Sequence, residues 1–114
     1  MGKLDSIIDS SGSDIPFISE VIALYKSTSI EALDMAFKAI DSNDRLSLKK
    51  AAHKIKGSAL NFGINAVSDL AKHIETNSQT LASADLSNCL VELQKSNSLL
   101  ITELEQELSL LQKK

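Results

Sequence analysis

The sequence has little of what irregular or cross-linked folds require. Its 114 residues include one cysteine, one proline, four glycines and no tryptophan. A single cysteine, Cys89, excludes an internal disulfide and a cysteine-rich zinc site, and this favours a cytoplasmic location. With so few residues that interrupt helices, the composition is typical of an all-helical protein.

Long apolar runs and an excess of positive charge are also missing. No stretch approaches the roughly 20 apolar residues of a membrane-spanning helix, and the N-terminus lacks the pattern of a signal peptide. The net charge of −3 argues against a nucleic-acid-binding surface. A hydrophobic content of 43% is enough for a real core. We therefore expect a single domain over residues 1–114, with neither a membrane nor a nucleic acid as partner.

Apolar residues recur at helical spacing along most of the chain. They predict helices from the N-cap Asp14 to about residue 41, and over about 44–62, 65–77 and 84–111. The weak segment 27–29 could split the first of these, but its apolar stripe stays in phase and favours one long helix. Residues 1–13 predict a short helix and a loop. Short connections then predict an antiparallel, up-down four-helix bundle with a short extra N-terminal helix.

The last predicted helix is dominated by leucines at near-heptad spacing. They are Leu86, Leu90, Leu93, Leu100, Leu104, Leu108 and Leu111. Asn97 takes one position of this stripe, where a polar residue can fix the register of a bundle. The surplus apolar residues Leu99, Ile101 and Leu110 leave dimerisation as an alternative to the monomer that we expect.

The helix over 44–62 carries the most informative pattern. Its predicted buried stripe consists of Leu48, Ala52, Ile55, Ala59 and Phe62. By helical geometry His53 lies about 140° from the centre of that stripe, and Gly57 about 180°. The histidine therefore points at water or at a partner, and the missing side chain at Gly57 leaves space beside it.

Five residues of this stretch, His53, Lys56, Gly57, Ser58 and Gly63, resemble the signature of histidine-containing phosphotransfer (HPt) domains. A long amphipathic helix before the motif and a Leu-Ala-x-x-Ile-Glu segment after it extend the resemblance. The resemblance implies a four-helix bundle that receives a phosphoryl group on histidine. It also implies exchange of that group with an aspartate of a receiver domain, and a sensor or hybrid histidine kinase as a second partner.

The chemistry of the side chains agrees with this resemblance. Imidazole is neutral and nucleophilic near neutral pH, so His53 is the predicted phosphoacceptor. Lys56, one turn further on, is placed to meet the added negative charge. Glu75 on the next helix is the candidate to hold Nδ1–H of His53, which leaves Nε2 to attack. The motif suggests that Ser58 helps to hold the site.

The surroundings of His53 predict a docking surface. Lys49 and Lys50 raise the local positive potential, although lysines on a solvated helix face often have no specific role. Leu46 and Leu60 fall on the His53 side of the helix and are candidates for contact with a receiver domain.

The sequence offers no glycine-rich phosphate loop and no room for a nucleotide-binding domain. We therefore expect a phosphocarrier rather than a kinase, with the Mg²⁺ for the transfer supplied by the receiver partner. His53, His73 and Glu75 could supply three metal ligands but no fourth, so no metal site is predicted.

Two other interpretations remain open. The chain could be a helical interaction module in which His53 is never phosphorylated. It could also be the phosphoacceptor domain excised from a larger hybrid or chemotaxis-type kinase, although Met1 and the neat helical ends favour a stand-alone protein.

Overall fold

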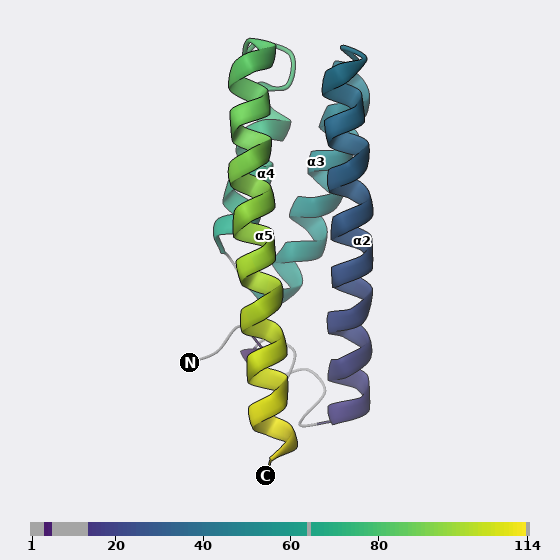
Figure 1. Ribbon diagram of the computed structural model, residues 1–114, viewed down its shortest axis with the longest axis vertical. Helices are drawn as coiled ribbons and strands as arrows, with labels where there is room; N and C mark the ends of the chain where they lie inside the picture. The colour runs from purple at the N-terminus through teal and green to yellow at the C-terminus, as the bar shows by residue number, and fades with distance from the viewer. Residues whose placement is uncertain (1–3, 6–13, 64, 114) are drawn as a thin grey trace.

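The computed structural model describes residues 4–5, 14–63 and 65–113. Its helices are α2 (Ile15–Asp41), α3 (Arg45–Ala59), α4 (Ala66–Asn77) and α5 (Ser83–Gln112), with a 3₁₀ turn η1 (Leu60–Phe62) after α3 (Figure 1). The helices pack with antiparallel contacts and the described residues contain no strand, which confirms the predicted bundle. The predicted N-terminal helix falls almost entirely outside the described residues.

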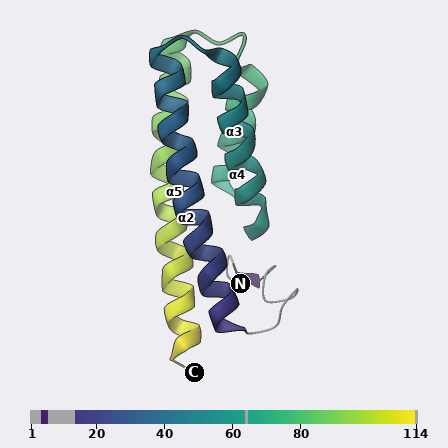
Figure 2. The same ribbon diagram turned by 90° about the vertical axis from the view of Figure 1, so that its right-hand side faces the viewer.

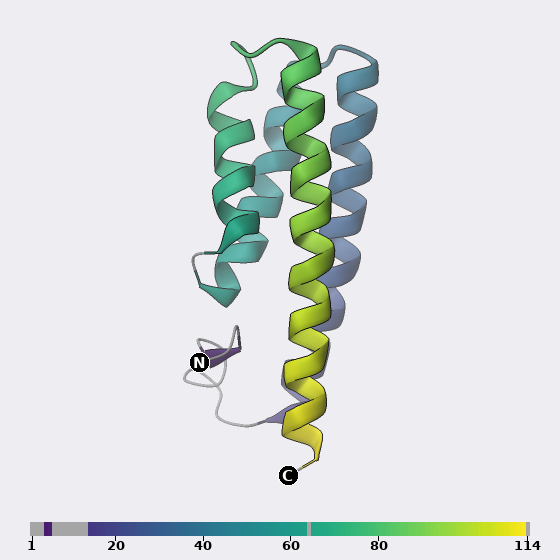
Figure 3. The same ribbon diagram turned by 60° about the vertical axis from the view of Figure 1, so that its left-hand side comes forward.

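The bundle is long and uneven. It measures 48 × 19 × 18 Å, and α2 and α5 run along its length while the shorter α3 and α4 cover only part of it (Figure 2). The α2–α3 and α4–α5 connections lie together at one end (Figure 3). All four helices are therefore packed together only in the half of the molecule that contains these two connections.

The helices begin where side chains can cap them. Asp14 accepts a hydrogen bond of 3.2 Å from the backbone N–H of Phe17, and Pro16 follows in the first turn of α2. Asp44 caps α3 in the same way through the backbone N–H of Ser47. α2 runs unbroken to Asp41, which confirms one long helix rather than two.

The core is formed by the predicted apolar stripes. In the second predicted helix the five stripe residues are all buried, and the last residue, Phe62, lies in η1 because α3 ends at Ala59. Leu86, Leu90, Leu93, Leu100 and Leu104 of α5 are buried as well. The treatment of Ile101 as surplus apolar surface was wrong, because this residue packs in the core, whereas Leu99 and Leu110 are exposed.

A buried polar network joins the two long helices. The Tyr25 hydroxyl donates to Asn97 Oδ1, and Asn97 Nδ2 donates to Ser29 Oγ over 3.0 Å. The Tyr25 ring also packs edge-on against Phe62, with ring centroids 5.1 Å apart. Polar groups removed from water in this way favour one alignment of α2 against α5, because a shift would leave them without partners.

Within the described residues, no helix is long and apolar enough to cross a membrane.

Candidate functional site

His53 stands on the outer face of α3. Its neighbours along the chain, Ala52 and Ile55, are buried against the other helices, while 66% of the His53 side chain is exposed. The ring therefore projects from the part of the bundle in which four helices hold α3 in place. An exposed imidazole on a rigid helix can be reached by another molecule without any unfolding of the bundle.

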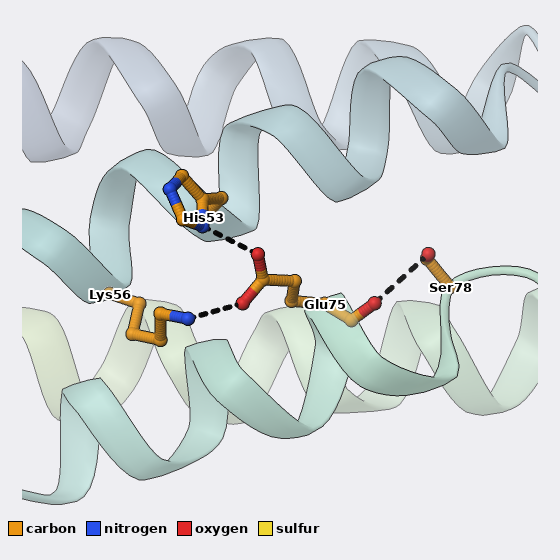
Figure 4. A network of polar contacts seen from close by, with 4 residues as sticks. All are labelled: His53, Lys56, Glu75 and Ser78. Atoms are coloured by element: carbon orange, nitrogen blue, oxygen red, sulfur yellow. Dashed lines mark hydrogen bonds and ion pairs between the residues drawn. The ribbon is translucent and has the colours of Figure 1, made fainter.

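Glu75 of α4 fixes one side of that ring. Its Oε2 lies 2.5 Å from His53 Nδ1, and the Glu75 side chain is only 16% exposed (Figure 4). A carboxylate can only accept here, so Nδ1 carries the proton of this hydrogen bond. In the neutral ring the lone pair is then on Nε2, the nitrogen that can attack an electrophile.

The second oxygen of Glu75 accepts a hydrogen bond from Lys56. Lys56 Nζ donates to Oε1 over 2.6 Å, and its side chain is 25% exposed. The pKa of Glu75 is lowered, chiefly by the hydrogen bond from Lys56. Burial opposes this with the next largest effect, and the hydrogen bond from His53 adds a smaller lowering. Glu75 is therefore ionised at neutral pH, as its bond with Nδ1–H requires.

This ion pair was missing from the sequence prediction, which directed Lys56 at an incoming phosphoryl group. The spacing of three residues between His53 and Lys56 puts both side chains on the α4 side of α3, within reach of one carboxylate. That spacing was the only signal of the pair in the sequence.

The connection between α3 and α4 determines how far α4 is shifted along α3, and so which residues of the two helices lie opposite one another. Asn65 caps α4 by a reciprocal pair of bonds with Ser68, and its Nδ2 also donates to the carbonyls of Ala59 and Gly63, at 3.0 and 2.8 Å. Gly63 has φ 83° and ψ 178°, a conformation open almost only to glycine. Asn65 was not singled out from the sequence, although Asn-x-x-Ser before an apolar helix is a recognisable capping pattern.

Arg45 holds the other end of the α3–α4 pair. Its guanidinium donates to the carbonyls of Ser78 and Leu81 in the α4–α5 connection, at 3.1 and 2.5 Å. The Ser78 hydroxyl donates in turn to the backbone carbonyl of Glu75 (Figure 4). Hydrogen bonds thus hold both ends of α4, and they keep Glu75 in place opposite His53.

Gly57 is exposed, and a Cβ built on it would meet nothing within 4 Å. Packing inside the bundle therefore does not require glycine at this position. Ser58, the next residue, is half-buried, and no hydrogen bond of its hydroxyl occurs within the described part of the chain.

The four residues predicted to contact a partner all lie on the surface. Lys49 and Lys50 are exposed, and Leu46 and Leu60 each expose about half of their residue surface, 56% and 46%. Leu60 also lines an open hollow between α3 and α4, beside Lys56.

The second histidine has a different environment. His73 is exposed on α4, and Asn77 Nδ2 donates to the backbone carbonyl of His73 over 2.8 Å and approaches its Nδ1 at 3.3 Å. An amide donor at Nδ1 favours the tautomer with the proton on Nε2, the reverse of His53. Among the residues that the structure describes, no group of three or more potential ligands is arranged to hold a metal ion.

The site thus consists of an exposed imidazole held by a carboxylate on the outer face of a helical bundle. The family model of the Hpt domain matches residues 20–114, and the chain belongs to this family. Membership implies a part in histidine phosphotransfer within a phosphorelay, and Hpt domains in general interact with receiver domains and histidine kinases. No kinase domain is detected in the chain. Neither the curated proteins nor the solved structures yielded a match.

Proposed function

We propose that this protein carries a phosphoryl group on Nε2 of His53 and exchanges it with an aspartate of a receiver domain. The observation that supports this most strongly is the bond of 2.5 Å between His53 Nδ1 and Glu75, on a ring whose other side is exposed. The bond selects the tautomer with a nucleophilic Nε2 and leaves that atom open to a partner.

The transfer step follows from this geometry. Nε2 attacks the phosphorus of a phosphoaspartate, a P–N bond forms, and the P–O bond to the aspartate breaks in line with it. The imidazole becomes more positive as the bond forms, and the ionised Glu75 stabilises that charge through Nδ1–H. The reverse step returns the phosphoryl group to a carboxylate. The divalent cation for this chemistry comes with the receiver domain.

Lys56 has two roles in this proposal. Before transfer, its ammonium group balances the negative charge of the ionised Glu75 and holds the carboxylate in position through the bond of 2.6 Å. After transfer, the phosphoryl group brings further negative charge close to the same ammonium group, which can then stabilise it. Gly57 leaves the approach to Nε2 clear, because its position faces open space.

Phosphorylation by phosphoramidate tests the function without a protein partner. In this reaction the P–N bond of the donor breaks, a P–N bond to the imidazole forms, and ammonia leaves. We expect one acid-labile, base-stable phosphate per chain in the wild type and in His73→Gln. We expect none in His53→Gln, with unchanged helicity.

The same experiment separates the alternatives. An interaction module would bind partners but would retain no phosphate on His53, whether the phosphate donor is phosphoramidate or a phosphorylated receiver. A domain taken from a larger kinase would accept phosphate in the same way, so the stand-alone form is a separate proposal. Sequencing of the flanking gene region tests that point.

A further inference from the structure

Positive charge is concentrated on one helix of this acidic protein. Although the net charge is −3, residues 45–59 contain five of the twelve basic residues and no acidic residue. α5 shows the opposite bias, with five acidic residues and a single lysine. α3 and α5 each pack mainly on α2 and α4, so they occupy diagonal corners of the bundle (Figures 1 and 3).

Most lysines of α3 and α4 also differ in their pairing from the lysines of α2 and α5. On α2 and α5, Lys26, Lys38 and Lys95 each have a carboxylate within 4 Å, at 3.4, 2.9 and 3.9 Å. Four exposed lysines of α3 and α4, which we term the basic collar, form no such ion pair within the described residues: Lys49, Lys50, Lys54 and Lys72. Among the other described lysines this is true only of Lys113, at the C-terminal end of α5.

The basic collar lies on the two helices that form the site. Lys49 and Lys50 lie one turn before His53 on α3, and Lys54 follows it directly. Lys72 lies one turn before Glu75 on α4, where it lines the hollow of about 260 Å³ together with Lys56, Leu60, Ser68 and Asp69. The collar therefore includes residues from both helices that form the site.

Such an arrangement has a cost in the isolated protein. Lys50 and Lys54 are four residues apart on one helix, a spacing at which like charges repel by about 0.2–0.5 kcal/mol. An anionic partner surface would reverse the sign of the interaction.

We propose that the basic collar is a docking surface for the acidic rim around the acceptor aspartate of a receiver domain. This inference rests on the proposed function and adds Lys54 and Lys72 to the partner surface. A carboxylate acceptor beside the oxygen ligands of a divalent cation is necessarily rich in negative charge. The collar attracts that surface towards His53, and the acidic α5 on the diagonal corner disfavours the reversed approach.

Two double variants of equal net charge test the role of position. Lys54→Gln/Lys72→Gln removes two lysines of the collar, and Lys38→Gln/Lys95→Gln removes two that are already paired elsewhere. Each protein is first phosphorylated with phosphoramidate. The second-order rate of transfer is then measured, at several salt concentrations, to the receiver domain of the same genome that accepts phosphate fastest from the wild type.

We expect the collar variant to transfer several-fold more slowly at low salt and to lose part of the salt dependence, with the control close to wild type. The maximal rate within the complex should stay unchanged, because neither lysine touches the reacting atoms. Equal losses in both variants, or none in either, would overturn the proposal, as would transfer to none of the receivers. Failure of phosphoramidate to label His53 would instead overturn the proposed function itself.

Discussion

His53 and Glu75 are 22 residues apart in the sequence, yet Nδ1 of one lies 2.5 Å from Oε2 of the other across the α3–α4 interface. The pair joins an exposed ring to a largely buried carboxylate. It therefore links the packing of the bundle to the protonation of a single nitrogen atom. The chemistry proposed for the protein depends on this link.

The substitution Glu75→Ala should slow the phosphorylation of His53 by phosphoramidate about 10-fold or more. This estimate corresponds to the loss of a hydrogen bond to a charged group, roughly 1.5–3 kcal/mol. Glu75→Gln, which keeps an acceptor oxygen but loses the charge, should lie between Ala and the wild type. Rates are measured by the incorporation of phosphate over time. Equal rates in all three proteins would show that Glu75 does not act on the ring.

The ion pair at Glu75 predicts a pH-dependent part of the stability. The pKa of Glu75 in the folded protein is lowered below its ordinary value of 4.5. A group with a depressed folded pKa contributes stability that is fully present above the unfolded pKa and is lost as the pH falls through the folded pKa. The difference in free energy of unfolding between wild type and Glu75→Gln should therefore shrink below pH 4.5. Urea titrations at pH 7 and at stepped acidic values measure it, and a constant difference would contradict the assignment.

Gly57 should separate stability from function. Because a Cβ at this position meets nothing within 4 Å, Gly57→Ala should stabilise the protein by roughly 0.5–1 kcal/mol, the usual gain within a helix. Gly57→Gln should slow transfer to a receiver domain while leaving phosphorylation by phosphoramidate almost unchanged, because only the larger partner is obstructed. Thermal unfolding and the two rates are the measurements. A parallel loss in both rates would place the effect on the ring rather than on docking.

Asn97 should be among the most sensitive positions of the core. Asn97→Ala leaves the Tyr25 hydroxyl and Ser29 Oγ without their buried partner, at a cost of about 1–3 kcal/mol for each group. Ser29→Ala removes only the end of the network and should cost less. Chemical unfolding of the two variants compares them. An Asn97→Ala protein as stable as the wild type would mean that water replaces the lost bonds.

The helices were predictable because their apolar residues keep one phase over long stretches. The stripe that contains Leu48 and Ile55 placed His53 outside the core, and the structure leaves the ring exposed. Helix ends were within a few residues because Asp14 and Asp44 are good caps. The 3₁₀ turn after Ala59 was not predicted, since its residues continue the helical pattern.

Contacts between helices were harder to predict, because they depend on rotation and height as well as on periodicity. Ile101 lies outside the leucine stripe in the sequence pattern, yet the packing of α5 brings it into the core. Ser29 is a weak helix former by propensity, but in the structure it is buried and accepts a hydrogen bond from Asn97. To predict the bond between Lys56 and Glu75, one would need the position of α4 along the axis of α3. Asn65 fixes that position by its hydrogen bond to the carbonyl of Ala59, a contact that periodicity does not show.

The position of the phosphorus on the imidazole tests the central claim most directly. After labelling with phosphoramidate, ¹⁵N and ³¹P NMR of the intact protein identify which ring nitrogen carries the phosphoryl group. The hydrogen bond from Nδ1 to Glu75 predicts a single phosphohistidine, at Nε2 of His53. Phosphate on Nδ1 of His53, or on His73 in its place, would contradict the account.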